Sequence, residues 1–386
     1  MRKTFLTFGA PLIEQPEIEE VVDSLKSGWL GTGPKVHKFE EMFRKYKGSK
    51  YALAVNSCTA ALHLSLIVAG IKAGDEVIVP TMTFASTANV VTHVGAVPVF
   101  VDCEKDTMNI NSEDIEKKIT SKTKAIIPVH FAGRMCNMEK IMKIAKKYHL
   151  EVIEDCAHAI ETEVKGKKAG TFGRLGCFSF YVTKNITTGE GGMIITNNDE
   201  YAEKIKILSL HGMSKDAWNR FGGEGYKHYQ VLYPGYKYNM TDIQASIGIH
   251  QLPRVEKYWK KRQKIWNYYN QAFKDLPVFT PYSVEPDTRH AYHLYTLLLD
   301  IDKLKITRDQ FLEKMIERNI GLGVHYIALH LQPFYKKKFD YKTGDFPNAE
   351  WISERTVSLP FSAKLSDSDA KDVVGAVQDV LIKNLK

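Results

Sequence analysis

The 386-residue sequence has few cysteines and no long apolar run, and these absences exclude several classes of protein. The five cysteines are scattered, no two closer than about 20 residues, which excludes the CxxC pairs of metal and redox sites. No stretch approaches the roughly 20 apolar residues that cross a bilayer. The segment Met1–Ala10 lacks the apolar core and cleavage site of a signal peptide. We therefore expect a cytoplasmic protein with reduced thiols and no membrane partner.

Internal repeats, low-complexity tracts and Pro-rich linkers are also missing. The net charge is +8, from 53 basic and 45 acidic residues, and it is spread widely along the chain. A nucleic-acid partner is one interpretation of that charge. A basic pocket for an anionic small molecule, or an ordinary solvated surface, explains it as well. We expect no nucleic-acid partner.

Short apolar runs alternate with stretches of helical periodicity between about residues 51 and 196. The expected strands are Ala52–Val55, Val77–Val79, Val97–Val101, Ala125–Val129, Val152–Glu154, Cys177–Phe180 and Met193–Thr196. Between them, Thr59–Ala69 and Met138–Tyr148 have the apolar spacing of helices. This alternation predicts an α/β fold with a mostly parallel sheet between helices. Ligands of such sheets bind at the carboxyl ends of the strands.

The pattern changes after about Gln251, which predicts a second domain. A long helix is expected over Val255–Phe273, a strand over Tyr292–Asp300, and a helix over Thr307–Arg318 with Thr307 as its N-cap. The tail Ser366–Leu385 predicts another helix. We expect a large domain over residues 1–250 and a smaller α+β domain over residues 251–386.

Two polar residues follow apolar strands where chemistry is expected. Asp155 could cap a helix or form a loop ion pair, or it could keep the pyridine nitrogen of a cofactor protonated, which makes the ring a stronger electron sink. Lys184 lies in a loop rich in Thr and Gly between two apolar strands. A partly desolvated lysine loses its charge readily, and its neutral amine attacks aldehydes. Nearby Gly189, Gly191 and Gly192 allow the backbone to turn tightly.

Three weaker signals add to these two. The helix start at Thr59 could seat a phosphate, although plain capping by Ser57 or Thr59 explains it too. Phe84 follows a strand and could stack on a planar cofactor or simply be core. A buried strand delivers Ser179. Taken in order, these residues would supply the phosphate contact, stacking ring, pyridinium partner and amine that pyridoxal 5′-phosphate needs.

Motifs along nearly the whole chain resemble those of the DegT/DnrJ/EryC1/StrS family of nucleotide-sugar aminotransferases. The motifs are Ser27–Pro34, Pro80–Phe84, Glu154–His158, Phe178–Phe180, Thr183–Asn185, Gly189–Gly192, Tyr238–Ala245, Gly323–Tyr326 and Leu329–Pro333. The resemblance implies the fold-type I (aspartate aminotransferase-like) architecture. It also implies a seven-stranded, mostly parallel sheet and a smaller C-terminal α+β domain. One departure is Cys58, where a small residue such as Ala or Gly is expected.

The resemblance also implies roles for individual residues. Lys184 would bond to the aldehyde of pyridoxal phosphate and later move a proton between cofactor and substrate carbon. Asp155 would pair with the ring nitrogen, His158 with the phenolic oxygen, and Phe84 would stack on the ring. Thr59, Ala60 and Ser179 would hold the phosphate. Asn239 would reach the phosphate of a partner subunit, so the active site would need a homodimer.

The reaction and substrate follow from the same resemblance. Some relatives replace the lysine with His and act as dehydratases, so Lys184 points to transamination with L-glutamate as donor. The segment Tyr236–Asp242 and the pair His325–Tyr326 resemble members that act at C4 of a keto sugar rather than at C3. The expected substrate-binding residues are Thr32, His211, His325 and Tyr326, with Lys215 and Arg220 as further candidates to neutralise a diphosphate. Action at C3, sugar dehydration and a non-catalytic sugar-binding relative stay as alternatives.

Overall fold

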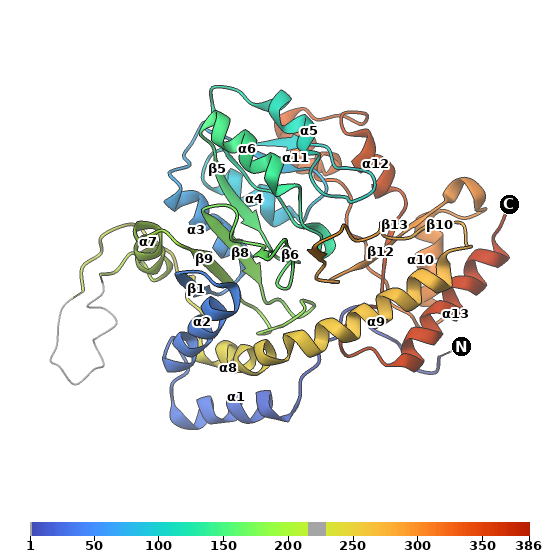
Figure 1. The fold of residues 1–386 in the computed structure, drawn as a ribbon, viewed down its shortest axis with the longest axis horizontal. Helices are drawn as coiled ribbons and strands as arrows, with labels where there is room; N and C mark the ends of the chain where they lie inside the picture. The colour runs from blue at the N-terminus through green and yellow to red at the C-terminus, as the bar shows by residue number, and fades with distance from the viewer. Residues whose placement is uncertain (1, 215–228) are drawn as a thin grey trace.

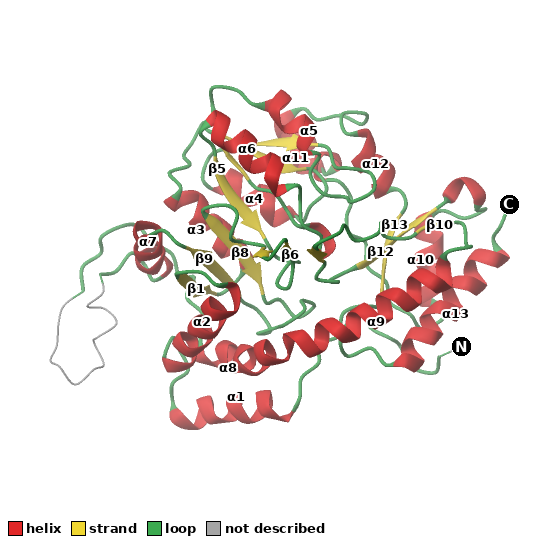
Figure 2. Cartoon of the chain, viewed as in Figure 1, coloured by secondary structure: helices red, strands yellow, loops and turns green. Residues whose placement is uncertain are grey.

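A computed structural model describes residues 2–214 and 229–386 and has a central seven-stranded sheet between layers of helices (Figures 1 and 2). Its strands are β1 (Tyr51–Val55), β2 (Glu76–Pro80), β3 (Val97–Val101), β4 (Thr123–Ile126), β5 (Glu151–Asp155), β8 (Leu175–Ser179) and β9 (Gly192–Thr196). Their order is β1-β9-β8-β5-β4-β2-β3. Strand β9 runs antiparallel to both neighbours, and the other pairs are parallel. The expected mostly parallel sheet is confirmed, and each expected apolar run overlaps one strand.

Helices surround this sheet, and most of them pack apolar side chains toward it. They are α1 (Gln15–Ser27), α2 (Pro34–Lys47), α3 (Cys58–Val68), α4 (Ala85–His93), α5 (Ser112–Ile115), α6 (Met138–Tyr148), α7 (Asp199–Ser209) and α8 (Asp242–Gln251). Helix α3 is buried along almost its whole length in the core. It begins at Cys58 because the Ser57 side chain accepts a hydrogen bond from the Ala60 N–H. A small second sheet forms where β6 (Glu163–Val164) pairs with β7 (Lys167–Lys168) on one side and with β11 (Thr288–Arg289) on the other.

The C-terminal third packs its own core. Strands β10 (Val278–Phe279), β12 (Tyr295–Leu299) and β13 (Thr356–Leu359) form a sheet. The remaining helices are α9 (Val255–Phe273), α10 (Arg308–Ile316), α11 (Pro333–Phe339), α12 (Pro347–Ser353) and α13 (Asp367–Lys383). Helix α9 runs from beside the main sheet to this C-terminal part (Figure 1). Thr307 caps α10 through a reciprocal pair of hydrogen bonds with Gln310, as the sequence predicted.

Both parts of the chain reach across the expected domain boundary. Near the N-terminus, Leu6 pairs with Ile320 and Arg2 forms an ion pair with Asp369, so the first residues pack on the C-terminal core. Conversely, α11 and α12 pack against the main sheet's core. The division into residues 1–250 and 251–386 stays a prediction.

Two findings bear on the absences in the sequence. All five cysteines are buried and free of disulfides. No helix among the described residues is both long and apolar enough to pass through a membrane.

Candidate active site

A cavity of about 540 Å³ lies at the carboxyl ends of the central strands. It brings together eight of the residues expected from the sequence: Thr59, Phe84, Asp155, His158, Ser179, Lys184, His325 and Tyr326. They come from distant parts of the chain, because parallel strands end at one edge of the sheet. The sequence prediction of a shared site therefore agrees with their placement, while the role of each residue stays a prediction.

Asp155 ends β5 and points its carboxylate into this cavity. One oxygen accepts a hydrogen bond from the Thr87 hydroxyl at 2.9 Å and the other from the Ala157 N–H at 3.1 Å. Burial raises the pKa of Asp155, although these donors and Lys184 act against the rise. A buried carboxylate with spare lone pairs is best stabilised by a further cationic donor, such as a protonated ring nitrogen.

Lys184 faces Asp155 from the loop between β8 and β9. Its backbone N–H donates to the Tyr181 carbonyl at 2.9 Å, which fixes the start of its side chain. Burial lowers the pKa of Lys184 from 10.5 to about 8, with Cys58 and Asp155 opposing the shift. A large fraction of the amine is therefore neutral near pH 8, as an amine that attacks a carbonyl must be.

The start of α3 forms another wall of the cavity, with Ser57, Cys58 and Thr59 along it. The backbone of Gly192 in β9 lies so close to this turn that a Cβ there would come within 2.5 Å of the Ser57 carbonyl. Ser179 ends β8 on the same side. A helix N-terminus with hydroxyl groups around it suits a phosphate group. Ala60, expected to hold the phosphate, does not line the cavity; its N–H is taken by Ser57.

Phe84 stands at the mouth of the cavity with 60% of its surface exposed. The alternative that this residue is simply core is therefore wrong. Its ring centroid lies 6.2 Å from that of Tyr326, which lines the same cavity. An exposed ring at a cavity mouth can cover the face of a planar ligand.

A backbone N–H determines which nitrogen of the His158 imidazole carries the proton. Its Nδ1 accepts a hydrogen bond from the Ala132 N–H at 3.2 Å. Burial, together with Lys184, lowers the pKa of His158 well below its usual range, so the ring is neutral and carries its proton on Nε2. That N–H donates to the Tyr326 hydroxyl at 3.3 Å. His158 thus presents a donor toward the cavity, as a partner of a phenolic oxygen must.

His325 and Tyr326 close the cavity from the C-terminal part of the chain. His325 bonds through Nδ1 to the Ser358 hydroxyl at 2.8 Å. Burial, aided by Lys184, lowers the pKa of His325 to about 3. Burial also raises the pKa of Tyr326, with Asp155 adding to the rise. Both groups are therefore neutral hydrogen-bonding groups at ordinary pH.

Three expected residues lie elsewhere. Asn239 and Thr32 bond to each other at 2.7 Å and line a separate cavity of about 370 Å³ beside the edge strand β1. His211 is exposed, and its backbone N–H bonds to the Tyr236 carbonyl. Lys215 and Arg220 fall outside the described residues.

Sequence reasoning missed two groups that contact the site. Thr87, in α4, donates to Asp155 and also bonds the Thr83 hydroxyl at 2.9 Å. Thr83 lies just before the start of α4 and Thr87 in its first turn; both are visible in the sequence, but the approach of Thr87 to β5 is not. The His293 ring packs on His158, with centroids 4.4 Å apart, although it follows in the chain by more than a hundred residues.

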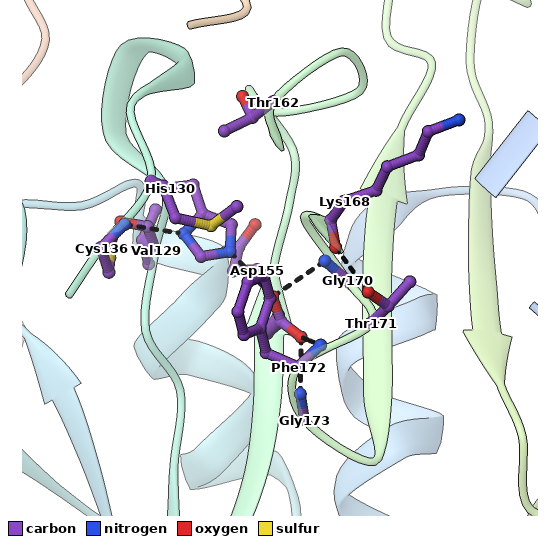
Figure 3. Close-up of polar contacts among 12 residues, drawn as sticks. Val129, His130, Cys136, Asp155, Thr162, Lys168, Gly170, Thr171, Phe172 and Gly173 are labelled. Atoms are coloured by element: carbon purple, nitrogen blue, oxygen red, sulfur yellow. Dashed lines mark hydrogen bonds and ion pairs between the residues drawn. The ribbon is translucent and has the colours of Figure 1, made fainter. Parts of the chain in front are cut away.

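A buried polar network lies immediately behind Asp155 (Figure 3). Both oxygens of Glu154 are used: the N–H groups of Phe172 and Gly173 donate to one, and Gly170 and His130 Nε2 donate to the other. Burial alone would raise the pKa of Glu154, but these donors outweigh it and lower the pKa. His130, Glu154 and Cys156 could form a metal-ligand group by distance alone. The four N–H donors instead give this carboxylate a structural role in holding the 170–173 turn against β5.

Comparisons with known proteins extend this picture. The chain from residue 11 to 378 matches the model of the DegT/DnrJ/EryC1/StrS aminotransferase family. The uncharacterized protein MJ1066 of Methanocaldococcus jannaschii is 56% identical over 100% of both chains. The spore coat polysaccharide biosynthesis protein SpsC of Bacillus subtilis is 48% identical over 98% of both. Spr1654 of Streptococcus pneumoniae, assigned as a sugar aminotransferase and solved in its PMP form, superimposes with a TM-score of 0.92 at 34% identity, covering 98% of this chain and 99% of that one.

The fold and the cavity together define a fold-type I enzyme of the aspartate aminotransferase-like class. Within that class, the chain belongs to the DegT/DnrJ/EryC1/StrS aminotransferase family. Spr1654 has also been solved in a PLP form, with a TM-score of 0.92, which supports pyridoxal phosphate as the expected cofactor. The cavity fits that group, because a buried carboxylate, an uncovered aromatic ring and a desolvated lysine surround one space.

Proposed function

We propose that the protein transfers the amino group of L-glutamate to the C4 keto group of a nucleotide-linked keto sugar, using pyridoxal 5′-phosphate. The observation that carries the proposal is Lys184, whose pKa of about 8 and position opposite Asp155 suit an amine that bonds to an aldehyde. The similarity to a polysaccharide biosynthesis protein and to a sugar aminotransferase supports a sugar substrate. The five free thiols fit a cytoplasmic location.

The residues of the cavity would divide the work among them. The cofactor, when bound, supplies an electron sink for the carbon that gains or loses a proton. Asp155 would keep its ring nitrogen protonated, and the His158 Nε2–H would donate to its phenolic oxygen. Thr59, Ser179 and the N–H groups at the start of α3 would hold its phosphate. Phe84 would cover the ring face and keep water from it.

Proton movement would fall to Lys184. Once its amine is released, its lowered pKa lets it accept a proton from one carbon and donate it to another at ordinary pH. His325 and Tyr326 line the same cavity as neutral groups and would hydrogen-bond the sugar hydroxyls. Because neither carries a charge, they orient the sugar without competing for the proton that Lys184 moves.

We propose further that the active enzyme is a homodimer with shared sites. Asn239 and Thr32, expected near a cofactor and a substrate, lie outside their own subunit's cavity. The side-chain oxygen of Asn239 is buried and accepts no hydrogen bond from the described residues, so a partner subunit could use it. Phe84 and Tyr181 are exposed at the cavity mouth, where a second subunit would cover them.

The first experiment follows the visible absorbance of the purified protein. L-glutamate should bleach the band of the bound cofactor, and a suitable 4-keto nucleotide sugar should restore it, with one 2-oxoglutarate formed per amino sugar. Lys184→Ala should show neither change. A protein that stays colourless after addition of pyridoxal phosphate refutes the proposal.

The same assay separates the alternatives. Restoration by 3-keto sugars alone would assign the reaction to C3, and NMR of the product identifies the aminated carbon. Loss of a sugar hydroxyl without 2-oxoglutarate would make the protein a dehydratase. Binding of a keto sugar without any turnover would indicate a non-catalytic relative. Tight binding to DNA that weakens steeply with salt would revive a nucleic-acid partner.

A further inference from the structure

A buried chain of polar contacts leads from helix α9 to the active-site cavity. Arg262, in α9, is only 1% exposed and forms an ion pair with Glu161, with Nη2 and Oε1 2.5 Å apart. The other oxygen of Glu161 accepts a hydrogen bond from Asn185 Nδ2 at 2.7 Å. Asn185 Oδ1 in turn lies 2.9 Å from Nδ1 of His293. The His293 ring then packs on that of His158.

The direction of each hydrogen bond in this chain is determined. The carboxylate of Glu161 only accepts, so the side-chain nitrogen of Asn185 must face it, and that nitrogen also donates to the Ala291 carbonyl at 3.0 Å. The Asn185 oxygen therefore faces His293 and accepts from it. Burial lowers the pKa of His293 well below its usual range, with Lys184 adding to the effect, so its neutral ring carries the proton on Nδ1.

The series of polar contacts is also connected to His158 at a second point. The His293 backbone N–H donates to the Ala132 carbonyl at 3.0 Å, and the Ala132 N–H is the group that donates to His158 Nδ1. His293 thus contacts the ring of His158, by packing, and also holds Ala132, the residue whose N–H fixes the His158 tautomer. Asn185 also follows Lys184 directly in the chain.

We propose that Glu161, Asn185 and His293, anchored by Arg262, are positioning residues that hold His158 with its Nε2–H directed into the cavity. This inference rests on the proposed function, because that N–H would donate a hydrogen bond to the phenolic oxygen of pyridoxal phosphate. The residues touch neither cofactor nor substrate. They act by fixing one imidazole and the residue that follows the reactive lysine.

A consequence for the bound cofactor can be measured. An N–H donor stabilises negative charge on the phenolic oxygen, so losing it makes the proton shared with that oxygen harder to remove. The pH at which the visible band changes should rise by about 0.5 to 1 unit, the size of one hydrogen bond. The titratable and charged groups around the two imidazoles are Lys184, His325, Tyr326, Arg262 and His290.

The test compares Asn185→Ala and His293→Phe with His290→Phe. His290 is a matched control, since it is buried on the same segment but its ring packs on Trp266 and Tyr292 instead. Asn185→Ala and His293→Phe should each raise the pH at which the visible band changes. The double variant should raise it no further than either single variant. The control should leave it in place. An equal shift in His290→Phe, or additive shifts in the double variant, overturns the proposal.

A measurement without cofactor keeps this proposal separate from the proposed function. Nitrogen-15 NMR of the cofactor-free protein should find the proton of His158 on Nε2 and that of His293 on Nδ1. Asn185→Ala should release His293 from this single state. A His293 ring protonated on Nε2 in the unmodified protein overturns the proposal that these residues position His158, whether or not pyridoxal phosphate binds. Failure of the protein to bind the cofactor, with both tautomers as expected, counts against the proposed function alone.

Discussion

Replacing Lys184 with Met should make the cofactor-free protein more stable while abolishing turnover. Lowering the pKa of this lysine from 10.5 to about 8 means that the folded chain disfavours its charged form by roughly 3 kcal/mol, at about 1.4 kcal/mol per pH unit. A methionine of similar length carries no charge to desolvate. At pH 7 we therefore expect Lys184→Met to raise the free energy of unfolding by about 2 to 3 kcal/mol.

The pH dependence gives the prediction its sign. Between about pH 8 and 10.5 the unfolded chain holds a proton on Lys184 that the folded chain has lost, so the stability of the unmodified protein rises with pH in that window. The difference in the free energy of unfolding between Lys184→Met and the unmodified protein should be largest below pH 8 and should shrink as the pH rises above 8. Denaturant unfolding followed by tryptophan fluorescence, from pH 6.5 to 9.5, measures that difference.

Lys47 provides the control. Burial lowers its pKa to about 8 as well, but its ammonium donates to the Ile160 carbonyl at 3.1 Å, outside the cavity. Lys47→Met should show a similar pH-dependent difference yet leave the spectrum of the bound cofactor unchanged. A Lys184→Met protein that is less stable than the unmodified chain, or a difference constant across pH, refutes the reasoning.

Three further predictions concern Asp155, Phe84 and Glu154. Asp155→Asn should still bind the cofactor but slow turnover about 10- to 100-fold, the value of a charged hydrogen bond, in a steady-state assay. Phe84→Ala should weaken cofactor binding about 3- to 10-fold in a spectral titration, while Phe84→Tyr keeps it, because only the stacking ring is lost. Glu154→Gln should lower the free energy of unfolding by about 2 to 3 kcal/mol at pH 7, since an amide has one acceptor for four donors. That loss should diminish as the pH falls below about 4.5, where the unfolded chain takes up a proton on Glu154, and further as the pH passes through the lowered pKa of the folded residue; an undiminished loss in acid contradicts it.

The main sheet could be predicted from the sequence because its strands are buried on both faces. A run such as Val77–Val79 is apolar without alternation, and each expected run has a counterpart among the seven strands. Helices with strong local signals could be predicted in the same way: α6 and α9 begin and end where their apolar spacing does. The packing of the N-terminal segment on the C-terminal core could not be predicted from the sequence, because the pairing of Leu6 with Ile320 has no local signature.

The candidate site was predictable where residues end strands of one sheet, as Asp155 and Ser179 do. It was not predictable where contacts depend on how separate segments pack. Thr87 reaches Asp155 only because α4 starts beside β5, and His293 meets His158 only because segment 291–293 pairs with segment 132–133. Thr32 was expected near a substrate and Asn239 near the cofactor of a partner subunit; both lie at the sheet edge beside β1, and these two roles stay predictions.

The antiparallel pairing of β8 with β9 makes the loop that carries Lys184 a closed ring of backbone. The loop leaves β8 after Ser179 and re-enters the sheet at Gly192, and these two residues are register partners. Hydrogen bonds from Phe180 to Gly191 and from Thr188 to Phe180 fasten its base. The number of residues in this loop therefore determines how far the Lys184 amine lies from the sheet. Inserting or deleting a single residue in this ring would move the amine while the sheet below stays intact.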